Sequence, residues 1–246
     1  SFFRINGYGV RYLDCLNGTG RLSPKRNEYG AGRFMKQAID RPEPLVEFPR
    51  PYFRYGVRRD HFIQCLSSLP HPNLIMVTSM MTYWYPGVFA TIQALRSVYP
   101  QIPLILGGIY ASLCPNHAAL SGADRVLTGP GEMHIAGIIE DVFGHSPSFL
   151  ADFNDPDSHP YPAFDLIPQP DPVPILTARG CPHHCTYCAA HRLYSGFRRR
   201  DPFKVADEIR HWHQRFGVKN FSFYDDALLV DPDVMALPLL RTLRKR

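Results

Sequence analysis

The chain contains 246 residues, of which 45% are hydrophobic and 20% are charged, and its formal net charge is +5. This composition is ordinary for a globular protein. No apolar run reaches the roughly 20 residues that a membrane-spanning helix needs, and no signal peptide opens the sequence. A mild positive charge without a long basic block gives no indication of a nucleic-acid partner. We therefore expect no membrane protein, and nucleic acid is not indicated as a partner.

The first part of the chain alternates predicted strands with predicted helices. An early strand is predicted at 9–17, and short apolar runs bounded by breakers predict strands at 73–79, 103–108 and 124–129. Helical patterns occupy 86–99 and 132–144, and the proline-rich stretch 41–60 is interpreted as a surface loop or a lid. The alternation predicts an α/β fold, with a doubly wound, Rossmann-like parallel sheet over 1–144. Ligands of such sheets bind at the carboxyl ends of the strands.

A proline-rich linker is predicted at 145–172, followed by a second α/β unit at 173–246. The linker has no periodicity, and its prolines prevent regular structure. In the second unit a helix should begin with Asp201 as N-cap and Pro202 at its first position, and end before Gly217. An apolar strand precedes this helix and another follows it. The order of strand, helix and strand predicts the first units of a (β/α) barrel.

Three of the six cysteines gather in "GCPHHCTYC", at Cys181, Cys185 and Cys188. The other three are scattered beside apolar runs, where we expect buried thiols: Cys15, Cys65 and Cys114. This distribution is not that of a disulfide framework. A cluster of thiols instead predicts a metal site in a reducing compartment, hence a cytoplasmic protein.

Three clustered thiols leave two kinds of metal site open. A structural zinc ion needs four ligands, and one of three nearby histidines could complete the set: His183, His184 or His191. Three thiolates on a cubane iron–sulfur cluster instead leave one iron without a protein ligand. An open coordination position is what a catalyst requires, so the pattern favours a cluster.

The motif "RGCPHHCTYC" resembles the cluster loop of the radical S-adenosylmethionine (radical SAM) superfamily. The resemblance implies that Cys181, Cys185 and Cys188 ligate a [4Fe-4S] cluster and that Tyr187 lies against the adenine of S-adenosylmethionine. The activity implied is cleavage of S-adenosylmethionine to a 5′-deoxyadenosyl radical, with an electron donor such as flavodoxin or ferredoxin. The substrate of the radical is not implied. Many members carry a strand-end motif that contacts the methionyl amine, and Asp225 or Asp226 would serve here, unless they cap a helix near Pro232.

The first part resembles the cobalamin-binding-type domain of one radical SAM class. By this likeness, the corrin or nucleotide face is lined by Ser79, Thr82, Gly107, Gly108, Gly129, Gly131 and Glu132. The glycines are also explained by turns after strands, and Met80 and Met81 are expected in the core. The D-x-H-x-x-G motif that supplies a histidine to cobalt is absent, and neither His117 nor His134 has the placement expected of such a ligand. Cobalamin is therefore a candidate cofactor without that histidine.

The chain looks like a fragment cut at both ends, because the first strand of the family is missing and few residues follow the cysteine loop. We thus expect an incomplete radical SAM enzyme. One alternative is a non-catalytic zinc- or iron–sulfur-binding module. A second is an RNA-modifying enzyme similar to the methylthiotransferases, which lacks the support of a separate basic, aromatic-rich binding domain.

Overall fold

The computed structural model describes residues 1–16, 34–168 and 170–244. Its strands are β1 (Lys36–Ile39), β2 (Tyr52–Tyr55), β3 (Ile75–Ser79), β4 (Leu104–Gly107), β5 (Arg125–Val126), β6 (Val173–Ile175), β7 (Ala178–Arg179), β8 (Arg198–Arg199) and β9 (Phe221–Phe223). Its α-helices are α1 (Phe2–Ile5), α2 (Arg59–Ser67), α3 (Tyr85–Val98), α4 (Gly108–Leu113), α5 (Pro115–Ala118), α6 (Ile135–Phe143), α7 (Ala190–Leu193), α8 (Pro202–Phe216) and α9 (Ala236–Arg244). No helix of the described residues is long and apolar enough to cross a membrane.

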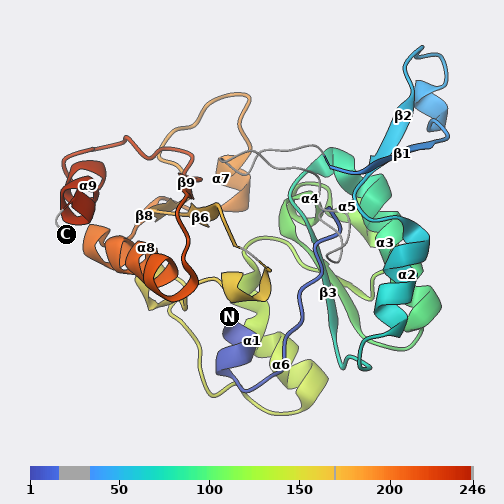
Figure 1. The fold of residues 1–246 in the computed structure, drawn as a ribbon, viewed down its shortest axis with the longest axis horizontal. Helices are drawn as coiled ribbons and strands as arrows, with labels where there is room; N and C mark the ends of the chain where they lie inside the picture. Colours follow the sequence, from blue (N-terminus) through green and yellow to red (C-terminus); the bar gives the residue numbers. More distant parts are fainter. Residues whose placement is uncertain (17–33, 169, 245–246) are drawn as a thin grey trace.

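The first sheet consists of three parallel strands in the order β3-β4-β5, as predicted for 73–79, 103–108 and 124–129. Their runs of Ile, Leu and Val suit strands that are buried between layers. Figure 1 shows α2 and α3 together on one side of this sheet. The core between them contains Phe62, Leu66, Ile92, Leu95, Leu104 and Leu106. The predicted α/β class with parallel sheets is confirmed.

Two predictions for the region before this sheet are wrong. Residues 9–16 form no strand, and residue 17 lies outside the described part. The run includes Arg11 and Asp14, and the carbonyl of Cys15 accepts a hydrogen bond from the Val57 amide at 2.8 Å. The stretch 41–60 is not all loop, because β2 pairs antiparallel with β1. The two strands form an arm that projects from the molecule (Figure 1).

The second unit is built on the parallel pair β6 and β9, with β7 and β8 forming a separate antiparallel pair. Helix α8 covers the parallel pair and packs against α9, with Val205, Ile209 and Trp212 in the shared core. Its predicted ends are confirmed: Asp201 accepts hydrogen bonds from two amides of the first turn, and Gly217 takes the left-handed conformation at the other end.

The proline-rich segment 145–172 is tied to the start of the chain. Arg4 of α1 contacts both carboxylate oxygens of Asp165, at 2.6 and 2.8 Å. The Asn6 side chain donates to the Phe149 carbonyl at 3.0 Å and accepts from the Phe149 amide at 2.8 Å. The segment is thus a strap that holds α1 against the body.

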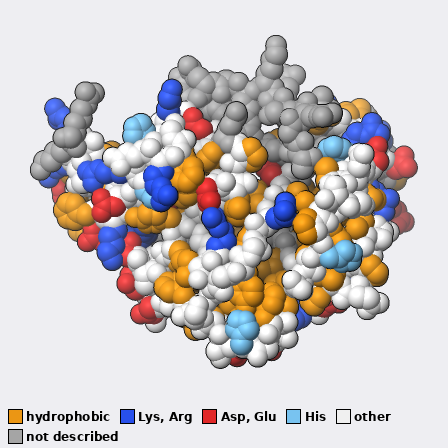
Figure 2. Space-filling view, turned by 60° about the horizontal axis from the view of Figure 1, so that its bottom comes forward, with side chains coloured by type: hydrophobic (Ala, Val, Ile, Leu, Met, Phe, Trp, Pro, Cys, Tyr) orange, Lys and Arg blue, Asp and Glu red, His pale blue; other side chains and the backbone are white. Residues whose placement is uncertain are grey.

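On the face drawn in Figure 2, positive and negative side chains are interspersed with apolar ones.

Candidate functional site

A cavity of about 360 Å³ lies at the carboxyl ends of β3, β4 and β5. This volume is within the range of about 300–1,000 Å³ that is usual for small-molecule sites. Five of the predicted ligand-lining residues form part of its wall: Gly107, Gly108, Gly129, Gly131 and Glu132. The second unit contributes Arg179, Leu193 and Tyr194. The cavity therefore lies between the first sheet and the segments on either side of the cysteine loop.

The turn after β4 packs closely against the end of β3. Gly108 has φ +89°, and a Cβ there would overlap the Thr78 hydroxyl and lie 2.8 Å from the Ser79 carbonyl oxygen. Ser112 connects this turn to the turn after β5, because its hydroxyl donates to the Gly108 carbonyl at 2.8 Å and accepts from the Gly129 amide at 2.9 Å. Sequence reasoning missed Thr78 and Ser112. The position of Ser112, one helical turn after Gly108, is the signal that could have indicated it.

The segment after β3 is placed differently from the glycine turns. Ser79 is buried and donates to the Met81 carbonyl at 3.1 Å, and Thr82 begins the 3-10 helix η2 (Thr82–Trp84). Neither side chain is among those that line the cavity. Met80 and Met81 are exposed, so their expected place in the core is wrong. They directly follow Ser79, the last residue of β3.

The three clustered cysteines lie on the loop between β7 and α7. Cys185 is exposed, and Cys181 and Cys188 are partly buried. The Cys188 sulfur accepts a hydrogen bond from the Ala190 amide at 3.4 Å. Gly180 has φ +79°, and a Cβ there would overlap the carbonyl oxygen of residue 196. Only glycine therefore fits where the chain enters the loop.

The donor set of this loop, three thiols at nearby positions, is chemically compatible with a cubane iron–sulfur cluster. Among the described residues, no three His, Cys, Asp or Glu side chains are close enough together to hold one metal ion. A cubane binds each thiolate through a different iron, so three thiols on one accessible loop are compatible with it. The rings of His184 and His191 stack on each other, with centroids 6.1 Å apart, at the same loop.

The scattered cysteines are less buried than expected. Cys15 is exposed, while Cys65 and Cys114 are partly buried. No disulfide joins any of the six cysteines in the described part of the chain. The residues are thus less buried than predicted, although Cys114 packs against the core of the first unit and burial raises the pKa of the Cys15 thiol.

Asp225 supports the chain just before the cysteine loop. Its Oδ1 accepts from the Thr177 amide at 2.7 Å, the Thr177 hydroxyl at 2.9 Å and the Ala178 amide at 2.8 Å. It does not cap a helix near Pro232, so that alternative is wrong for Asp225. Its Oδ2 is buried and has no partner among the described residues. Asp226 is exposed.

Tyr187 projects from the tip of the loop and is 91% exposed. No ring of the described part is close enough to stack on it. Its side chain can therefore turn toward a ligand without breaking a packing contact.

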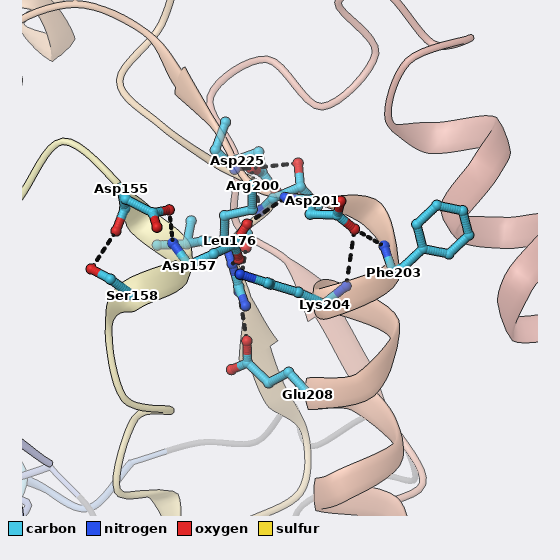
Figure 3. Close-up of polar contacts among 12 residues, drawn as sticks. Asp155, Asp157, Ser158, Leu176, Arg200, Asp201, Phe203, Lys204, Glu208 and Asp225 are labelled. Carbon is cyan, nitrogen blue, oxygen red and sulfur yellow. Dashed lines mark hydrogen bonds and ion pairs between the residues drawn. The ribbon is translucent and has the colours of Figure 1, made fainter. Parts of the chain in front are cut away.

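A buried ion cluster around Arg200 holds the chain between β6 and β7, which leads to the cysteine loop (Figure 3). Arg200 contacts Asp157 of the strap at 2.8 Å and Glu208 of α8 at 2.5 Å, and it donates to the Leu176 carbonyl at 3.0 Å. Burial disfavours the charged guanidinium, but the two carboxylates outweigh this effect and raise the pKa of Arg200. The strap, α8 and the end of β6 are thereby joined at one charged side chain.

A second ion pair joins the cavity to the loop. Arg179 of β7 contacts Glu132 of the 3-10 helix η4 (Gly131–His134) at 2.5 Å, and the side chains are 19% and 23% exposed. Burial would raise the pKa of Glu132, but the charge of Arg179 and hydrogen bonds lower it below its ordinary value. The acid and the base of the cavity wall thus neutralise each other. Sequence reasoning missed Arg179, which lies two positions before Cys181.

Comparison with known proteins yields several related enzymes, although no protein-family model matches the chain. The anaerobic magnesium-protoporphyrin IX monomethyl ester cyclase of Synechocystis is 25% identical over 189 residues, which is 63% of this chain and 37% of the relative. The cytidylyl-2-hydroxyethylphosphonate methyltransferase of Streptomyces wedmorensis is 22% identical over 285 aligned residues, 92% of this chain and 49% of the relative.

A shorter match has a higher sequence identity. The bacteriochlorophyllide d C-12(1)-methyltransferase of Chlorobaculum tepidum is 40% identical over 63 residues, 24% of this chain and 14% of the relative. The chain spans about half or less of the length of these curated relatives. The comparisons confirm the resemblance to the radical SAM superfamily that the cysteine motif indicated.

Proposed function

We propose that this chain forms the cofactor-binding part of a radical SAM enzyme. The observation that supports this proposal best is the position of the cavity. It is walled by the predicted glycine turns on one side and by residues flanking the cysteine loop on the other. A ligand in the cavity would therefore lie beside a cluster on the loop.

The roles of the residues follow from the resemblance and from their surroundings. Cys181, Cys185 and Cys188 ligate a [4Fe-4S] cluster, and Tyr187 closes over the adenine. When bound, the reduced cluster supplies one electron to the sulfonium of S-adenosylmethionine, whose C5′–S bond breaks to give methionine and a 5′-deoxyadenosyl radical. The electron comes from a one-electron donor such as flavodoxin or ferredoxin. Asp225 holds the chain that enters the cysteine loop, and by the resemblance its carboxylate contacts the methionyl ammonium.

Cobalamin is the candidate ligand that we propose for the cavity, which at about 360 Å³ would receive part of the molecule. The paired charges of the cavity leave a nearly neutral wall, and bare glycine backbone allows a flat macrocycle to approach closely. Two nearby histidines are already engaged: His117 Nδ1 hydrogen-bonds the Tyr110 hydroxyl at 2.6 Å, and His134 Nε2 donates to the Thr128 carbonyl at 2.9 Å. We therefore expect cobalt to be bound without either imidazole.

The relatives set a limit to the reaction that we assign. Their names include methyltransferases and a cyclase, so the common element we propose is the radical-generating step. The acceptor of the radical is left open, because the relatives extend well beyond the matched part.

Anaerobic reconstitution with iron and sulfide tests the proposal. We expect about four irons per chain, and a reduced electron paramagnetic resonance (EPR) spectrum that changes when S-adenosylmethionine is added. Alanine at Cys181, Cys185 or Cys188 should abolish the cluster, whereas alanine at Cys15, Cys65 or Cys114 should not. Stoichiometric zinc without a cluster would overturn the enzyme assignment in favour of a zinc module.

Titration with hydroxocobalamin tests the assignment of the cavity. We expect a visible spectrum without histidine coordination. A histidine-bound spectrum that disappears in His117→Ala or His134→Ala would contradict the proposed mode of binding. A failure to bind would remove cobalamin and leave the cluster assignment standing.

A further inference from the structure

The Glu132–Arg179 ion pair connects the two units of the fold. Among the ion pairs of the described residues, it alone joins the first sheet directly to the second unit. The two residues are 47 positions apart in the chain. Both side chains are mostly buried, so solvent screens the attraction less than it would at the surface.

Each partner is attached to a rigid part of the site. On the sheet side, Glu132 follows the glycine turn that Ser112 ties to Gly108. On the loop side, a single residue separates Arg179 from the first cysteine, and that residue, Gly180, is pressed against the chain that leaves the loop. Pairing of β7 with β8 holds the same position. A displacement of the Arg179 backbone must therefore move Cys181.

We propose that the Glu132–Arg179 pair is a positioning contact that holds the cysteine loop in register with the cavity. Neither residue needs to ligate the cluster for this purpose. The pair sets where Cys181 lies relative to the glycine turns. The contact is present in the protein without cofactors. Only its role in catalysis rests on the proposed function.

Hydrogen exchange in the metal-free protein tests the contact by itself. Glu132→Gln keeps the shape of the side chain and removes its charge, so the fold should persist. We expect the amides of residues 178–181 to exchange about tenfold faster than in the wild-type protein. This factor corresponds to a loss of about 1.4 kcal/mol in the free energy of local opening. Arg179→Met should have the same effect, and Arg179→Lys should restore part of the protection.

A matched control is provided by another ion pair of the first unit. Arg125 of β5 and Asp141 of α6 are also 2.5 Å apart, but their side chains are 44% and 58% exposed and do not line the cavity. Arg125→Gln should leave exchange at 178–181 unchanged. Equal exchange in Glu132→Gln and in the wild-type protein would overturn the proposal.

The reconstituted protein gives a second readout that a merely structural contact would not alter. Glu132→Gln should still bind four irons, because all three thiols are present, while its EPR response to S-adenosylmethionine should differ from that of the wild type. An unchanged response would also count against the proposal. If the wild-type protein binds no cluster, the proposed function fails, and hydrogen exchange alone still decides whether the contact positions the loop.

Discussion

Arg200 and Glu208 form an ion pair of 2.5 Å although their side chains are only 12% and 3% exposed. Asp157 of the strap contacts the same guanidinium from another direction, at 2.8 Å. Charges removed from water are costly unless they are paired and hydrogen-bonded. The cluster therefore constrains the strap and α8 to one arrangement, in which the strand before the cysteine loop is held by the Arg200 side chain.

Removal of Glu208 should destabilise the fold strongly. In Glu208→Ala, Arg200 retains Asp157 but loses its other carboxylate, and we expect a loss of about 3 kcal/mol in the free energy of unfolding. Urea denaturation followed by circular dichroism measures it. Asp207→Ala is the matched control on the same helix, because the Asp207–Arg210 pair is exposed and should contribute less than about 1 kcal/mol. Similar losses in both variants would contradict the role given to the buried cluster.

Asp225→Asn should separate structural support from ligand binding. Asparagine can keep the oxygen that accepts from Thr177 and Ala178, while an amide donor replaces the unpartnered Oδ2. We expect the cluster to assemble normally and the EPR response to S-adenosylmethionine to weaken. Asp226→Asn, at the exposed neighbouring position, should respond like the wild type. The reverse pattern would assign the amine contact to Asp226.

The two glycines Gly108 and Gly137 should respond oppositely to alanine. Gly108→Ala places a Cβ against Ser79 in a left-handed backbone conformation, which alone costs about 1–3 kcal/mol. Gly137 lies on α6 with no atom within 4 Å of a Cβ position, so Gly137→Ala should stabilise the helix by about 0.4–1 kcal/mol. Thermal unfolding of both variants measures the difference. A neutral Gly108→Ala would show that this turn does not need a bare backbone.

Acid should weaken the contribution of Glu132. Its pKa in the folded protein is below the ordinary value of 4.5, so the unfolded chain binds the proton more readily. The stabilisation is therefore complete above about pH 4.5 and is lost as the pH falls through the lower pKa of the folded state. The stability difference between the wild type and Glu132→Gln, measured by urea denaturation, should shrink over that interval. A difference that does not change with pH would exclude a charge effect.

Short-range patterns allowed the parallel strands and the ends of α8 to be predicted. The apolar runs that became β3, β4 and β5 are bounded by prolines and glycines, and Asp201 caps α8 through its own first turn. The strand predicted at 9–17 failed because a β-strand requires a neighbour, which the residues of the run do not specify. Local composition therefore identified elements better than it identified their partners.

The site was predictable only where its chemistry is local in sequence. The shared place of the glycine turns in one cavity wall could be predicted from their position after strands, whereas ligation of a cluster by the three cysteines stays a prediction. The contact of Arg179 with Glu132 could not, because it depends on how two units meet. The same holds for Asp225, whose partners Thr177 and Ala178 lie nearly fifty positions earlier.

The attachment of α1 to the strap has a consequence for synthesis on the ribosome. Arg4 and Asn6 are translated long before Phe149 and Asp165. A helix of four residues cannot persist in water by itself. The segment that contains α1 must therefore wait without structure until the strap emerges, and the closing of so long a loop makes this contact one of the late events in folding.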